Sequence, residues 1–228
     1  MEREKKETPE KEGVPVRKSI LRGIHYVAGI LILAMGLTLN TKAGLGVSPI
    51  ISLPYSISQL YALDFGNSTL CAYVVLVLVE VCLHKGRQRL LDLLQVPFSI
   101  VFTRFLNLFS DCFPQEPVEF WQQLLVLALA ILLTGVGAAM TVNARLIPNP
   151  GDGIVNAIAE KIGRSMGFTK NIFDLFCVCI TFCIGAVTGH WLVGIGIGTV
   201  LAVLAVGRVI ALFNHLVKIK FGFIEKRA

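Results

Sequence analysis

Six long apolar runs divide this sequence, and they limit the chain to folds that a lipid bilayer can hold. A predominantly apolar helix of about 20 residues crosses the hydrocarbon core of a bilayer. With 54% hydrophobic and only 16% charged residues, the composition is typical of a polytopic membrane protein. We therefore expect an all-α membrane protein with six transmembrane helices. The expected spans are about 19–41, 67–84, 90–110, 119–142, 169–188 and 190–214.

The positions of the lysines and arginines predict how these spans are oriented. They gather in the N-terminal tail, the turn after the second span, the segment after the fourth span and the C-terminus, whereas the opposite side carries only Lys42. Loops rich in Lys and Arg stay in the cytosol, so both termini are expected there. Residues 1–18 are expected to form a disordered cytosolic tail, and 215–228 a basic cytosolic tail.

A segment in the second half is too short to cross a bilayer but begins like a helix. It extends over 150–163 and opens with Asn149-Pro150-Gly151-Asp152. Asn is a favoured N-cap, Pro fits the first helical position, and Asp complements the positive end of the helix dipole. At ~1.5 Å per residue this helix is ~21 Å long, against ~30 Å for the bilayer core.

A fainter counterpart lies earlier in the chain, where Ser48 and Pro49 open a short apolar helix over 49–62. If both segments enter the bilayer and return, their N-terminal amides must face a cavity, because unpaired backbone is not tolerated against lipid. Such helix starts bind anions and polar groups. The alternative is that both helices lie flat on the bilayer surface. The residues favour re-entry and leave the surface position open.

The two short segments belong to an internal repeat with an offset of 101 residues. Each half contains three spans, an odd number, so the halves must have opposite orientations. We expect membrane repeats over 19–110 and 119–214, an inverted arrangement that many transporters use. The offset superposes the residues that bracket the short helices: Gly36 on Gly137, Pro49 on Pro150 and Gly66 on Gly167.

Arg104, Arg208 and Asp152 lie within or beside the spans and are further candidates for contact with a solute. Arg104 and Arg208 are costly inside a membrane and usually face a bundle interior or a wet cavity, although both could instead extend to the interface. Asp174 is expected at a depth similar to that of Arg208 and could pair with it. Asp152 is expected to complement the helix dipole, with cation or proton binding as the alternative.

The other polar residues do not predict an enzyme. Glu80 and His84 lie one helical turn apart and are expected to form a solvated pair near the cytosolic rim. No set of His, Cys, Asp and Glu has metal-site spacing, and no catalytic triad or phosphate loop is found. The GIGIGT stretch at 194–199 falls within the sixth expected span, where small residues permit close helix packing. We expect no catalytic residue, no metal and no cofactor.

Three stretches resemble a bacterial protein family. They are PGDGIVNAIAEKIGRSMGFTKNIFDL (150–175), GIGIGTV (194–200) and GLGVSP (44–49), and they are similar to the YczE/YyaS/YitT-type bacterial integral membrane proteins over about 25–215. The resemblance implies a small multi-span protein of the bacterial cytoplasmic membrane and supplies no substrate. In the family pattern a Pro follows the Gly at 207, where this chain has Arg208, which argues against a family-wide role for that arginine.

Together these features predict an inverted-repeat membrane protein that moves a small polar or anionic solute. The alternative is a non-transporting accessory or regulatory membrane protein, in which the repeat only packs six helices. The expected partners are the lipid bilayer and the solute, with no nucleic acid; a homo-oligomer is left open. The expected site residues are Ser48, Pro49, Arg104, Asn149, Pro150, Gly151, Asp152 and Arg208.

Overall fold

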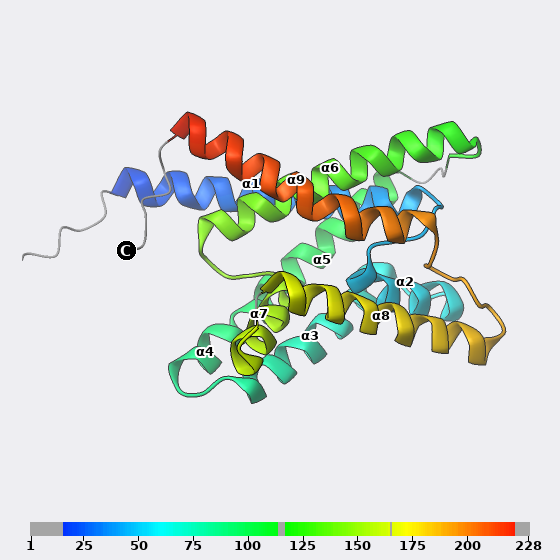
Figure 1. Ribbon diagram of the computed structural model, residues 1–228, viewed down its shortest axis with the longest axis horizontal. Helices are drawn as coiled ribbons and strands as arrows, with labels where there is room; N and C mark the ends of the chain where they lie inside the picture. The colour runs from blue at the N-terminus through cyan, green and yellow to red at the C-terminus, as the bar shows by residue number, and fades with distance from the viewer. Residues whose placement is uncertain (1–15, 114–116, 165, 222–228) are drawn as a thin grey trace, which may run out of the picture.

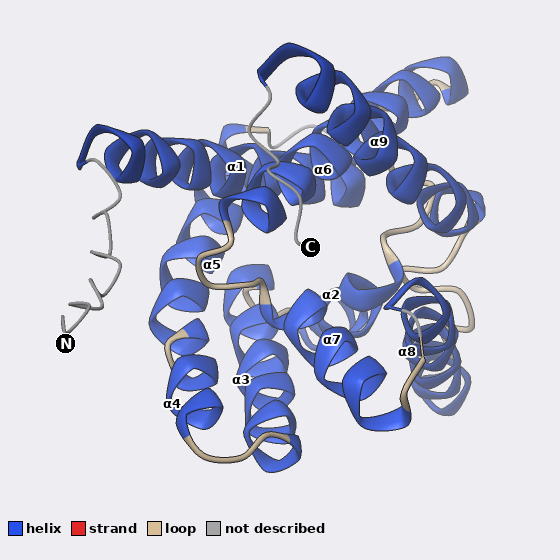
Figure 2. Ribbon diagram, turned by 60° about the vertical axis from the view of Figure 1, so that its left-hand side comes forward, coloured by secondary structure: helices blue, strands red, loops and turns tan. Residues whose placement is uncertain are grey.

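The computed structural model describes residues 16–113, 117–164 and 166–221, and this part of the chain is helical, without a strand (Figure 2). Figure 1 shows α1, α6 and α9 along one side, the short helices with α3 and α8 on the other, and α5 between them. The helices are α1 (Val16–Lys42), α2 (Pro49–Tyr61), α3 (Phe65–Leu83), α4 (Arg87–Leu93), α5 (Gln95–Cys112), α6 (Phe120–Ala144), α7 (Pro150–Ile162), α8 (Met166–Thr188) and α9 (Ile197–Phe221).

Six segments are long and apolar enough to cross a membrane, which confirms the predicted number of spans. The terminal tails expected over 1–18 and 215–228 lie partly outside the described residues. Their described parts are helical, because α1 starts at Val16 and α9 continues to Phe221. The spans are Ile20–Lys42, Phe65–Leu83, Arg87–Cys112, Phe120–Ala144, Gly167–Thr188 and Ile197–Val217.

The third span is broken into α4 and α5 at Leu94. Pro97 lacks an amide hydrogen, and its ring clashes with the carbonyl of the residue four positions earlier, Leu93, which is where α4 ends. The break turns Asp92 and Gln95 toward α3, and both are buried. The break at Leu94 therefore places two polar side chains inside the protein.

The sixth span begins later than the sequence predicts. The expected start was residue 190, but α9 begins at Ile197, because Gly189 and Gly194 both adopt positive φ and the chain between them forms turns. The first glycines of the GIGIGT stretch therefore precede the helix instead of lying inside it.

The two short helices form at the predicted positions, within a residue at their ends. At the start of α7 the Asn149 side chain accepts a hydrogen bond of 3.0 Å from the Gly151 amide. Ser48 makes no such bond at the start of α2; its own amide donates instead to Asn40 Oδ1 at 2.7 Å. The predicted N-cap of α7 is confirmed, whereas α2 is fixed by a side chain from α1.

Each short helix packs against the same two long helices. Both α2 and α7 contact α3 and α8, and Figure 2 shows them between these two helices. The polar and small residues on their inner sides are buried, among them Ser52 and Ser56 in α2 and Gly151 and Gly153 in α7. The short helices are therefore enclosed by protein along one side.

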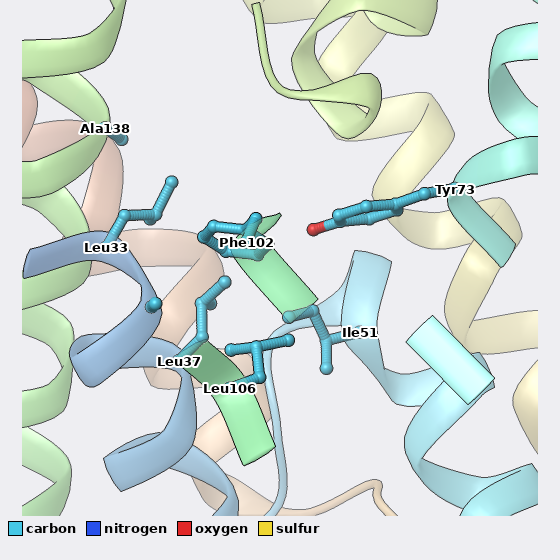
Figure 3. Packing of buried hydrophobic residues seen from close by; sticks show 8 residues of the cluster. Leu33, Leu37, Ile51, Tyr73, Phe102, Leu106 and Ala138 are labelled. Atoms are coloured by element: carbon cyan, nitrogen blue, oxygen red, sulfur yellow. The ribbon is translucent and has the colours of Figure 1, made fainter. Parts of the chain in front are cut away.

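Close contacts between small residues join α1 to α6. A Cβ at Gly36 would lie 2.5 Å from the Thr134 amide nitrogen, and a Cβ at Gly137 would overlap the backbone of Leu33. These contacts run in opposite directions along the two helices, so α1 and α6 are antiparallel. Leu33 also joins the hydrophobic core shown in Figure 3, which includes Leu37, Ile51, Tyr73, Phe102, Leu106 and Ala138.

Candidate functional site

The starts of α2 and α7 touch each other inside the bundle. Ile50 and Gly151 are the second residues of the two helices, and a Cβ at Gly151 would lie 3.1 Å from each of two methyl carbons of Ile50. Pro49, Pro150 and Gly151 are buried, whereas Ser48 and Asn149 remain partly exposed. The structure thus brings together the two helix starts that the sequence singled out.

The start of α7 is surrounded by polar groups from α3 and α8. The Tyr73 hydroxyl, on a side chain that is 2% exposed, interacts with the Asn149 side chain, and Figure 3 shows it pointing toward Phe102. Lys170 Nζ lies 2.9 Å from Asp174 Oδ1 on α8. Both groups act on Asp152: burial raises the pKa of its carboxyl, the Lys170 charge opposes this rise, and the Asp174 charge adds to it.

A small and a larger cavity flank this meeting point. The small one, of about 30 Å³, lies beside Asn149 and Pro150 and has room for about one water molecule. The larger one, of about 450 Å³, extends between α2 and α3 from Asp64 to Ile50 and is lined mainly by apolar side chains. Ile50 lines the larger cavity and also contacts Gly151 at the start of α7.

Arg104 lies away from the helix starts, at the opposite end of α2. Its exposed guanidinium donates to Asn67 Oδ1 at the beginning of α3. The neighbouring Asn107 holds the same turn, because its Oδ1 accepts from the Gly66 amide at 2.8 Å and its Nδ2 donates to Asp64 Oδ1 at 2.7 Å. These polar residues thus fasten α5 to the turn between α2 and α3.

We expect Asn107→Ala to lower stability, since it removes both bonds and leaves the Gly66 amide, which is in a buried residue, without its partner. The expected loss is ~1–3 kcal/mol in the free energy of unfolding, measured by SDS titration of the purified protein. Asn156→Ala is the matched control, because among the described residues the side chain of that exposed asparagine bonds only to Glu160, one turn away. Equal stability of the two variants would contradict this assignment.

Arg208 lies on the exposed surface of α9. The pairing of Asp174 with Arg208 that depth suggested is wrong, because Asp174 forms its ion pair with Lys170, one turn earlier on the same helix. Similar depth along two helices does not by itself bring side chains together, because it leaves open which helix faces turn toward each other. Of the predicted site residues, the structure gathers those at the two helix starts and leaves both arginines outside.

The polar cluster of Glu80, His84 and Asp92 was missed in the sequence. Glu80 is 2% exposed, and His84 Nδ1 lies 2.8 Å from Asp92 Oδ2, so the expectation of a solvated Glu80–His84 pair is wrong. The break before Pro97 folds Asp92 back onto α3, which a continuous third span could not do. The sequence feature that indicates this fold-back is Asp92, which lies within an apolar run shortly before Pro97.

Two of the family-like stretches contact each other through their backbones. The Val47 amide donates to the Gly194 carbonyl at 3.0 Å, and the Gly198 amide donates to the Leu45 carbonyl at 2.7 Å. A Cβ at Gly46 or at Gly196 would overlap backbone atoms of the other stretch. This contact fixes the segment that leads into Ser48, and hence the start of α2.

These features define a polytopic membrane protein built entirely of helices in its described residues, with a polar centre where two short helices begin. The chain matches the family described as a family of unknown function (DUF6198) over residues 20–215, and it belongs to that family. No solved structure matches it.

Three relatives agree with the resemblance drawn from the motifs. The chain is 26% identical over 192 residues to the uncharacterized membrane protein YczE of Bacillus subtilis, covering 84% of each chain. It is 24% identical over 212 residues to the uncharacterized protein YyaS of the same organism, covering 88% of this chain and 96% of that one. An uncharacterized protein of Haemophilus influenzae is 26% identical over 189 residues, covering 82% and 80%.

Proposed function

We propose that the protein moves a small polar or anionic solute across the bacterial cytoplasmic membrane, with both termini in the cytosol. The observation that carries the proposal is the contact of Ile50 with Gly151, because it places two helix N-termini side by side within the bundle. The positive dipole ends of helices attract anions and electronegative atoms. Non-helical backbone is tolerated at membrane depth where it is buried in protein or faces a cavity. The segments that lead into α2 and α7 meet this condition, so we infer that both short helices are re-entrant.

An inverted repeat is part of this proposal, and it is supported by contacts that come in exchanged pairs. In such a repeat, each residue of a contact can be replaced by its counterpart 101 positions away in the other half. For the contact of Gly36 with Thr134, this replacement gives the contact of Gly137 with Leu33. Both contacts are present, and α1 and α6 run antiparallel. A two-fold axis between oppositely oriented halves predicts this exchange.

The short helices obey the same exchange. Ser52 Oγ lies 2.8 Å from Thr181 Oγ1, and the exchanged pair is Gly153 with Glu80, where a Cβ would lie 2.7 Å from Glu80 Oε2. Ile50 and Gly151 are counterparts of each other, so the same replacement returns the same contact. A contact of this kind is expected on the proposed two-fold axis. The inferred solute site therefore lies between the halves, where transporters built from inverted repeats bind their substrates.

The charges around α7 support a solute with an electronegative group. Lys170 and the positive end of the α7 helix dipole attract such a group, whereas ionised Asp152 and Asp174 repel it. The raised pKa of Asp152 keeps that carboxyl protonated to a higher pH than a free aspartate. We infer that a protonated Asp152 donates a hydrogen bond to the solute, so that passage of an anion accompanies protonation.

Purified protein in liposomes tests the proposal. Probe solutes are chloride, nitrate, acetate and phosphate as anions, and glycerol and urea as neutral polar molecules. We expect at least one of them to enter protein-containing vesicles at least tenfold faster than protein-free vesicles. Folded protein that passes none of the six would exclude transport of these solute classes and favour the alternative, an accessory or regulatory membrane protein.

We expect Ile50→Ala to speed the entry of the transported probe at least fivefold. Truncation removes the methyl carbons with which Ile50, a residue that lines the 450 Å³ cavity, contacts Gly151 at the start of α7. Leu53→Ala is the matched control, because Leu53 lines the same cavity without being among the nearest contacts of Gly151. Entry rates are compared in liposomes at equal protein content. If both variants speed entry equally, Ile50 is not the barrier.

A further inference from the structure

A second polar centre lies one turn along α7 from the helix starts. Glu80 and His84 are one turn apart on α3, and Asp92 comes from α4 beyond the turn at Gly86. One ligand atom from each of the three side chains lies within 4.8 Å of the others. The backbone of α7 at Gly153 covers the cluster, and a side chain there would collide with Glu80.

With both of its carboxyl groups ionised, this cluster does not balance its charges. Glu80 and Asp92 are each 2% exposed, and among the described side chains no lysine or arginine lies within 4.0 Å of either carboxylate. His84 is the single basic partner, so at most one positive charge faces two carboxylates. A buried carboxylate without a counter-charge is costly, and a cation would remove this cost.

Two buried polar atoms beside these carboxylates have no hydrogen-bond partner among the described residues. Gln95 is 1% exposed and donates through Nε2 to Glu80 Oε2 at 2.9 Å, yet its Oε1 has no hydrogen-bond partner. That oxygen and both Glu80 oxygens lie 2.7–3.0 Å from one point above Gly153. His84 Nε2 is also buried without a hydrogen-bond partner. Such buried polar atoms are rare unless water or an ion satisfies them.

We propose that Glu80, His84 and Asp92 bind a divalent first-row transition metal ion, with Gln95 Oε1 as a further oxygen ligand. One imidazole with carboxylate and amide oxygens suits ions such as Zn²⁺ and Mn²⁺. Metal–ligand distances of ~2.0–2.2 Å separate opposite ligand atoms by at most ~4.4 Å, so a small side-chain adjustment closes the cluster. The ion joins α3, α4 and α5 beneath α7, and its binding does not depend on solute transport.

Calorimetry on the full-length protein in detergent, stripped with EDTA, tests this site. We expect one Zn²⁺ or Mn²⁺ per chain with a Kd at or below the micromolar range. Glu80→Gln and Asp92→Asn should each weaken binding at least tenfold, as expected for the loss of a ligand. Glu160→Gln is the control and should bind as the wild type does, because Glu160 is exposed and 4.0 Å from His84 Nε2.

Absence of binding to the wild-type protein, or unchanged binding by Glu80→Gln and Asp92→Asn, would overturn the proposal. If those variants do not fold, His84→Gln decides in the same way, since His84 is more accessible than either acid. Solute entry into liposomes is measured separately, so failure of the metal site and failure of transport are distinguishable.

Discussion

Gly196→Ala should prevent the chain from accumulating as folded protein. An added Cβ would overlap the Leu45 carbonyl oxygen and lie 2.9 Å from its carbonyl carbon, and backbone atoms cannot move aside as a side chain does. Displacing them also breaks the bonds from Val47 to Gly194 and from Gly198 to Leu45. We expect a loss of ~3 kcal/mol or more, the upper end of overpacking costs. Size-exclusion chromatography of a fluorescent fusion measures the folded fraction.

Gly207→Ala is the control, and it lies inside α9, the helix that begins directly after Gly196. A Cβ at Gly207 meets no atom within 4 Å, and alanine favours a helix over glycine by ~1 kcal/mol. This variant should therefore accumulate at least as well as the wild type. Normal accumulation and melting of Gly196→Ala would mean that the two glycine-rich stretches are not in close contact.

Asp152→Asn should abolish the pH dependence of anion entry. Burial raises the pKa of Asp152, so in the wild type we expect chloride or nitrate entry to rise as pH falls and this carboxyl gains its proton. Asparagine remains neutral, and at pH 8 it should permit entry at least tenfold faster than the wild type, ~1.4 kcal/mol in the barrier. The other ionisable groups that face Asp152 are Lys170 and Asp174 of α8 and Tyr73 of α3.

Thermal unfolding gives an independent reading of the same substitution. A raised pKa means that the folded state holds the Asp152 proton to a higher pH than the unfolded state does. Stability therefore falls as pH rises from the ordinary aspartate pKa toward the raised one, and Asp152→Asn should remove this decline. Asp111→Asn, at an exposed position of α5, should keep the wild-type profiles. Identical pH profiles for wild type and Asp152→Asn would contradict the role of Asp152.

Local sequence signals predicted the spans and short helices well. Apolar runs and the Asn149-Pro150 start depend on neighbouring residues alone, and both were located to within a few residues, apart from the late start of α9. The repeat hypothesis predicted that the two helix starts share one site, and Ile50 does contact Gly151. What could not be predicted depends on which helix faces turn toward each other: Asp174 pairs within α8, and Asp92 reaches Glu80 because α4 folds back.

The contact between residues 45–47 and residues 194–198 also sets an order for biogenesis. The early segment cannot make its backbone hydrogen bonds until the last span has been synthesised and inserted. Contacts between parts of a chain so far apart form late, since the intervening loop must first be closed. The first half of the newly made protein must therefore wait in the membrane, without its final form at the entrance to α2, until residues 194–198 have been synthesised.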